Sequence, residues 1–166
     1  MTSTKQLALG GILTGLAVLL QSIPCLFSEV FTPVTILSTL PIYIISRIKP
    51  RTGLAAYIAS ALLIALISIH EGVFFLCTNG LLGFTLGISL SKTNKKNVAI
   101  CIASSVLTIS LAFITFILGI SVFGFKTLTG IFPQMAVLLM FSIIYTALMA
   151  YLMENLYAFI SKKNVL

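Results

Sequence analysis

The chain has no aspartate and no tryptophan, and its acidic residues number only three, with one histidine. Magnesium sites for diphosphate substrates need clustered carboxylates, and acid–base catalysis needs titratable groups held close together. Glu29, Glu71 and Glu154 are far apart in the sequence, and the side chains of the neighbours His70 and Glu71 point in different directions. We therefore expect no metal site, no cofactor and no enzymatic activity.

Two further motifs are missing or incomplete. No glycine-rich loop is followed by lysine and serine or threonine, which excludes a P-loop for ATP. The three cysteines are too few and too scattered for a disulfide framework or a metal site. Cys25 and Cys77 are both expected near the same membrane face, so a bridge between them is geometrically possible, and unpaired thiols are the favoured alternative.

Apolar residues make up 59% of the chain and charged residues only 8%, with a mean hydropathy of +1.18. A soluble domain of this size could not bury so much apolar surface. Successive loops alternate between the two faces of the membrane, and of the ten Lys and Arg residues only Lys126 lies in a loop on the outer face. The other nine share the opposite side: Lys5, Arg47, Lys49, Arg51, Lys92, Lys95, Lys96, Lys162 and Lys163. This asymmetry predicts six membrane helices with both termini in the cytoplasm, where the cations meet lipid headgroups and not nucleic acid.

The apolar runs set the expected architecture, an all-α polytopic membrane protein with one domain over residues 1–166. The six helices are predicted at residues 6–23, 34–48, 53–69, 73–90, 98–122 and 132–161. The first run is expected to be a membrane span and not a signal peptide, because no small-residue cleavage site follows it. Pro24 is expected to end the first helix, residues 25–35 to form an outer loop, and residues 70–72 to form a tight turn.

Polar side chains gather toward the predicted outer side, and aromatic residues surround them. An apolar cleft with a few convergent polar groups is typical of a small-molecule site. The candidate substrate-binding residues are Glu29, His70, Glu71, Phe75, Asn79, Lys126, Gln134 and Tyr145. The alternative for the loop residues is simple contact with water, and for Tyr145 it is packing. Asn79 and Gln134 are the most informative, because an amide at membrane depth needs a partner.

Small residues recur at helical spacing in two of the predicted helices. Gly11 and Gly15 lie four residues apart in the first helix, and Gly83 and Gly87 do so in the fourth. Such faces allow another helix to approach closely. We expect the second pair to pack inside the bundle and the first pair to form a docking face. Glu154 is expected to pair with a loop cation such as Arg47 or Arg51.

The segment from Thr4 to Ala17, TKQLALGGILTGLA, is similar to the first helix of a known family. Together with six helices, about 170 residues and no ATPase motif, the chain resembles the S components of bacterial energy-coupling factor (ECF) transporters. These are substrate-binding membrane subunits whose first helix carries an alanine-xxx-alanine face. In this chain Gly11 and Gly15 occupy the matching positions.

The resemblance implies uptake of a vitamin or trace nutrient through a bacterial cytoplasmic membrane. It implies an extracellular pocket, closed by the first outer loop and lined by helices four to six, near Glu29, Asn79, Lys126 and Gln134. The chain would bind a T component and two ATPase subunits. ATP hydrolysis by the ATPase subunits would supply the energy, and the chain would topple in the membrane. The absence of tryptophan argues against the tryptophan-rich thiamine-binding members. Two other functions stay open: an accessory membrane protein that binds a protein or lipid, and a standalone secondary transporter.

Overall fold

The computed structural model describes residues 3–117 except 94, residue 119, and residues 130–162, and this part of the chain contains helices and no strands. Six of the described helical segments are long and apolar enough to cross a bilayer. They are Leu7–Leu26, Glu29–Ile48, Pro50–Ile67, Ile69–Lys92, Lys96–Phe116 and Ile131–Phe159. The predicted all-α fold with six membrane-length helices is confirmed.

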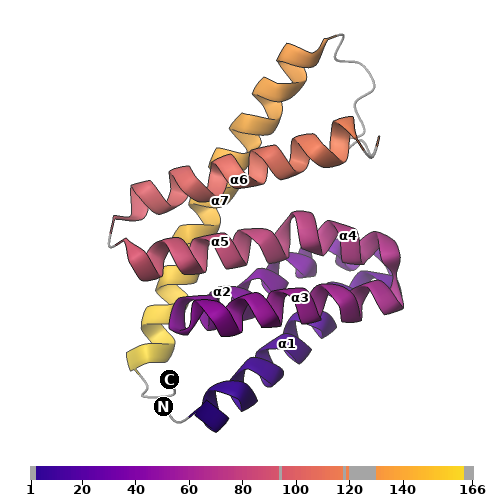
Figure 1. Ribbon diagram of the computed structural model, residues 1–166. Coiled ribbons are helices and arrows are strands. Elements are labelled where there is room, and N and C mark those ends of the chain that lie inside the picture. The colour runs from indigo at the N-terminus through magenta and orange to yellow at the C-terminus, as the bar shows by residue number, and fades with distance from the viewer. Residues whose placement is uncertain (1–2, 94, 118, 120–129, 163–166) are drawn as a thin grey trace. The chain divides into compact units, whose positions relative to one another are not determined.

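The chain forms two compact units, residues 1–94 and 95–166. The first unit contains helices α1 (Ser3–Leu26), η1 (Glu29–Ser38, a 3-10 helix), α2 (Thr39–Ile48), α3 (Pro50–Ile67), α4 (Ile69–Cys77) and α5 (Asn79–Lys92). Within it, α2 packs against α3 and α5, and α1 contacts α3 and η1. Helix α1 runs at an angle to α3 (Figure 1). The expected single domain stays a prediction.

The second unit pairs α6 (Lys96–Phe116) with α7 (Ile131–Lys162). The 32 residues of α7 span about 48 Å, more than the roughly 30 Å of a bilayer core. Glu154 on α7 pairs with Lys96, the first residue of α6. Pairing with Arg47 or Arg51, the two cations named for it above, stays a prediction. The predicted end of the fifth helix at residue 122 lies outside the described residues.

The end of the first helix differs from the prediction. Helix α1 continues through Pro24 to Leu26. Pro24 has no backbone N–H, so it removes one hydrogen bond of the helix, but the Ile23 carbonyl still accepts from Phe27 N at 3.0 Å. The expected loop over residues 25–35 is instead the end of α1 followed by η1. Ser28 caps η1 by accepting from Val30 N. Residues 34–38 of η1 were predicted to be helical, as the start of the second helix, whereas residues 29–33 were expected to lie in the loop.

Two more boundaries move near the predicted tight turn. Residues 70–72 belong to the first turn of α4, and the chain reverses at Ser68, which is extended and caps the helix by accepting from Glu71 N. The predicted fourth helix is broken at Thr78, whose backbone is not helical and whose hydroxyl donates to the Phe74 carbonyl. This break lets Asn79 begin α5 with its side chain turned into the first unit. The expected turn and the unbroken helix were therefore wrong.

Close backbone contact holds α5 against α2. A methyl group added to Gly83 would lie 2.5 Å from the Thr39 carbonyl oxygen, and one added to Gly87 would lie 2.6 Å from Ser46 Cβ. No side chain fits at these distances without moving the backbone. The expectation that this glycine pair packs inside the bundle is therefore confirmed.

We expect Gly87→Ala to lower stability by about 1–3 kcal/mol, since overpacking displaces the α2 backbone. Gly11→Ala is the matched control, because an added methyl group there has no described atom within 4 Å. Alanine is a better helix former than glycine by roughly 0.5–1 kcal/mol, so the control should be neutral or stabilising. Thermal unfolding of both variants in the same detergent measures the difference, and equal melting temperatures would contradict the packing argument.

Candidate functional site

A cavity of about 720 Å³ opens at one end of the first unit. Its walls come from the last turn of α1, the start of η1, the start of α4 and the junction of α4 with α5. The described lining residues are Gln21, Pro24, Cys25, Phe27, Ser28, Glu29, Thr32, Thr35, Ser68, His70, Glu71, Phe74, Thr78 and Asn79. The volume lies in the range of roughly 300–1,000 Å³ that is typical of small-molecule sites.

Gln21 is the centre of a buried polar network beneath this cavity. Its Nε2 donates to Glu71 Oε2 at 2.8 Å, and its Oε1 accepts from Asn79 Nδ2 at 3.2 Å. The Ser38 hydroxyl lies 2.9 Å from the same Oε1 and 2.6 Å from the Thr35 carbonyl, two acceptors that share its proton. Since the Glu71 carboxylate only accepts, the amide nitrogen of Gln21 must face it, which fixes the orientation of the amide. The network joins α1, η1, α4 and α5.

The members of this network are buried, so breaking one of its hydrogen bonds costs more free energy than it would at the surface. Gln21 is 2% exposed, Ser38 is fully buried, and Asn79 is 8% exposed. Asn79 Nδ2 also donates to the Thr35 carbonyl at 3.1 Å. Leaving one such group without a partner costs about 1–3 kcal/mol. The cavity floor is therefore a fixed array of polar atoms and not an adaptable surface.

Sequence reasoning did not single out Gln21 as a site residue. It lies near the end of an otherwise apolar run, from Leu7 to Ile23, which was interpreted only as a membrane span. The available signal was the amide itself, because a glutamine within a membrane helix needs a hydrogen-bond partner. The same argument had already marked Asn79, which proves to be its partner.

Four of the predicted substrate-binding residues meet at the cavity: Glu29, His70, Glu71 and Asn79. Their helix ends share one end of the first unit, as the topology predicted. Phe75 does not contribute to the described lining. It is fully buried behind the cavity, where its ring lies 6.3 Å from that of Tyr57 and beneath Gly80.

The remaining candidates belong to the second unit. Gln134 is half-buried in the first turn of α7. Tyr145 stacks on Phe141 with the ring centres 5.5 Å apart, a packing contact within α7. Lys126 lies outside the described residues. A binding role for these three stays a prediction.

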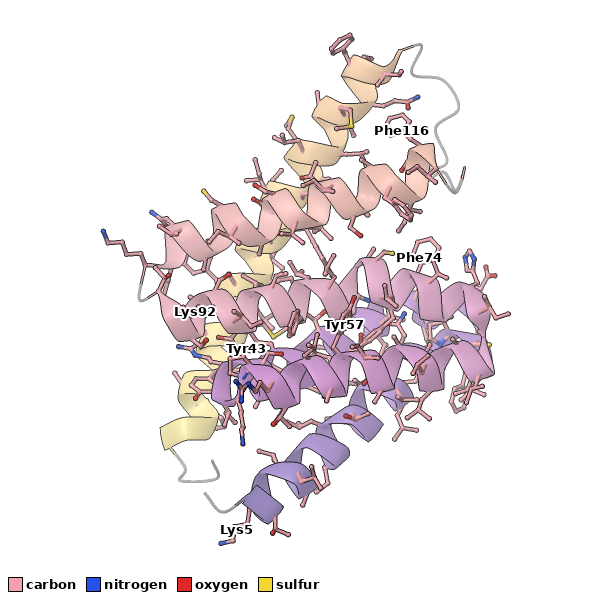
Figure 2. The ribbon with its side chains drawn as sticks, in the orientation of Figure 1. Lys5, Tyr43, Tyr57, Phe74, Lys92 and Phe116 are labelled. Carbon is pink, nitrogen blue, oxygen red and sulfur yellow. The ribbon has the colours of Figure 1, made fainter. Side chains whose placement is uncertain are left out.

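Charge is divided between the two ends of the first unit. Lys5 and Lys92 lie at one end and Phe74 at the other (Figure 2). Arg47, Lys49 and Arg51 lie at the junction of α2 with α3. This junction is near the end of α5, because a methyl group added to Gly87 would lie 3.2 Å from Arg47 N, so these cations belong to the same basic end. Both acidic residues of the unit line the cavity at the opposite end. None of the three cysteines, all of them described, forms a disulfide.

The two glycine strips of α1 have different surroundings. Gly10 packs on α3, where an added methyl group would lie 3.1 Å from Thr52 Cγ2. Gly11 and Gly15 are exposed, and no described atom lies within 4 Å of a methyl group added to either. Beside Gly11, a shallow groove of about 230 Å³ runs between α1 and α3, lined by small residues such as Ala55 and Ala59. This strip is an open face of α1.

Comparisons of the chain with models of known protein families, with curated proteins and with solved structures found no match.

Proposed function

We propose that the chain is the membrane-embedded, substrate-binding subunit of an ECF-type transporter for a vitamin or similar trace nutrient. The observation that carries this proposal is the cavity of about 720 Å³ with its buried amide floor. A buried, hydrogen-bonded polar network in membrane-length helices that opens to a cavity has the features of a preorganised ligand site.

The division of charge supports an outward-facing cavity. Cations are enriched in cytoplasmic loops of membrane proteins, so the basic end of the first unit belongs in the cytoplasm. The cavity then opens at the outer surface of a bacterial cytoplasmic membrane. Ligand capture from outside the cell is the role that this orientation favours.

The open strip of α1 supports a partner in the membrane. Gly11 and Gly15 are exposed on α1, and the groove beside Gly11 is lined mainly by glycine and alanine. On such a surface two helices can approach closely, and van der Waals packing then stabilises their association within lipid, where the hydrophobic effect does not. We assign this face to the T component, which would connect the chain to two ATPase subunits. ATP would be hydrolysed by those partners, so the chain itself needs no nucleotide site.

Native mass spectrometry of the purified protein tests the proposal. A small molecule that is retained by the wild-type protein and lost from Asn79→Leu supports it. Uptake of that molecule, dependent on a co-expressed T component and its ATPases, completes the test. A protein that retains no small molecule and supports no uptake contradicts the proposal.

The orientation gives a prediction of its own. Cys25 is exposed in the cavity wall and Asn97 is exposed at the start of α6. In a variant whose only cysteine is Cys25, a membrane-impermeant maleimide should react in intact cells. In an otherwise cysteine-free background, Asn97→Cys should react only after the membrane is permeabilised. The reverse pattern would overturn the orientation.

A further inference from the structure

The cavity lining is unusually rich in hydrogen-bond acceptors. Thr32, Thr35 and Thr78 each donate their hydroxyl hydrogen to a backbone carbonyl, of Glu29, Thr32 and Phe74 respectively. A hydroxyl that has donated its only hydrogen can still accept. These three threonines therefore present acceptors and no donor to anything that enters.

The amides of the floor have also used donors internally. Asn79 Nδ2 donates to Gln21 Oε1 and to the Thr35 carbonyl, and Gln21 Nε2 donates to Glu71. Ser28, Ser68, His70 and the second N–H of Gln21 can still donate, so a ligand's own acceptor is not excluded. The balance of the lining nevertheless favours a ligand that brings N–H or O–H groups.

The charged residues of the lining further limit the class of ligand that the cavity can bind. Glu29 and Glu71 are in the lining, and the described lining contains no lysine or arginine. Glu71 is only half exposed and lies beside the buried amides, where an anion would meet its field with little screening by water. A positive charge is favoured at this position and a negative charge is repelled.

Two aromatic rings complete the set of interactions. Phe27 and Phe74 both line the cavity. Aromatic faces attract cations and also cover an apolar body. Acceptors, carboxylates and aromatic rings together are the chemistry that recognises an amine in its protonated form.

We propose that the cavity selects a small organic ammonium ion with N–H donors and an apolar or aromatic body, held by Glu71. This assignment rests on the proposed function, since it names the chemical class of ligand for the same cavity. It gives Glu71 the specificity-determining role and makes Gln21 its positioning residue.

Three probes with the same phenyl body test the assignment: protonated 2-phenylethylamine, neutral 2-phenylacetamide and anionic phenylacetate. Each is titrated into the wild-type protein in lipid nanodiscs, with thermal unfolding and calorimetry as readouts. We expect the ammonium probe to bind and to raise the melting temperature, and the carboxylate to do neither. Glu71→Gln should weaken binding of the ammonium probe about tenfold or more, because the negative charge that strengthens its hydrogen bond to the ammonium group is lost.

Glu154→Gln is the matched control, since it removes the same charge from a carboxylate that is paired with Lys96 in the second unit. It should leave binding of the probe unchanged. Binding of phenylacetate or phenylacetamide at least as tight as that of the ammonium probe would overturn the assignment, as would binding by none of the three. Native mass spectrometry of the same preparation separates the two proposals. A retained neutral or anionic compound overturns the ammonium assignment and leaves the proposed function standing, whereas no retained compound and no binding overturn both.

Discussion

Replacing Gly11 and Gly15 together by leucine is expected to lower transport sharply while the protein stays folded. Both positions are exposed, and a Cβ atom added at either has no described atom within 4 Å. The bulky side chains would instead hold a partner helix away from α1 and remove many van der Waals contacts at once. An overpacked helix contact loses about 1–3 kcal/mol, which corresponds to roughly tenfold to a hundredfold weaker association with a T component.

The experiment measures three quantities for the double variant: co-purification with a co-expressed T component, cellular uptake and thermal unfolding. Uptake and co-purification should fall, and the melting temperature should stay at or above the wild-type value. The matched control is Gly83→Leu with Gly87→Leu, the same spacing in a buried contact of α5 with α2. That variant should fail to fold. A double variant at Gly11 and Gly15 that is well folded and transports at the wild-type rate would refute the docking face, and an accessory role for the chain would then gain support.

The six helices could be predicted from the sequence because membrane solvation imposes a simple rule. A segment of about 20 apolar residues must satisfy its backbone internally, so hydropathy alone identifies it. The finer boundaries follow other physics. Pro24 was expected to stop a helix that in fact continues to Leu26, and Thr78 breaks a segment that hydropathy presents as continuous. Both depend on single hydrogen bonds near a helix end, to which hydropathy is insensitive.

The parts of the candidate site that depend on helix topology could be predicted from the sequence, and the parts that depend on side-chain packing could not. Glu29, Glu71 and Asn79 meet because the ends of consecutive antiparallel helices share a membrane face. The glycine spacing predicted that Gly83 and Gly87 pack inside the bundle, but it did not show that α2 is the helix they contact. The position of Phe75 behind the cavity depends on side-chain direction at a helix break, which the pattern of residue types does not encode.

Gln21→Leu is expected to destabilise the first unit and to weaken ligand binding. The leucine fills a similar volume but leaves Glu71 without its amide donor, and it removes one acceptor each from Asn79 and Ser38, both of which keep the Thr35 carbonyl. A buried group that loses its partner costs about 1–3 kcal/mol, so unfolding should occur at a clearly lower temperature. Affinity for a retained ligand should fall roughly tenfold to a hundredfold, because the Glu71 carboxylate is no longer held in place.

A double-mutant cycle with Asn79→Leu distinguishes a shared network from two separate effects. If Gln21 and Asn79 bond each other, removing both leaves fewer orphaned groups than the two single changes suggest. The double variant should therefore lose less unfolding free energy than the sum of the singles, by about 0.5–3 kcal/mol. Thr85→Val is a control, since the Thr85 hydroxyl donates only to carbonyls of its own helix, and its effect should add to that of Gln21→Leu. Additive losses for Gln21 and Asn79 would show that the amides act independently, and Gln21 would then no longer be the residue that ties α1 to the floor of the cavity.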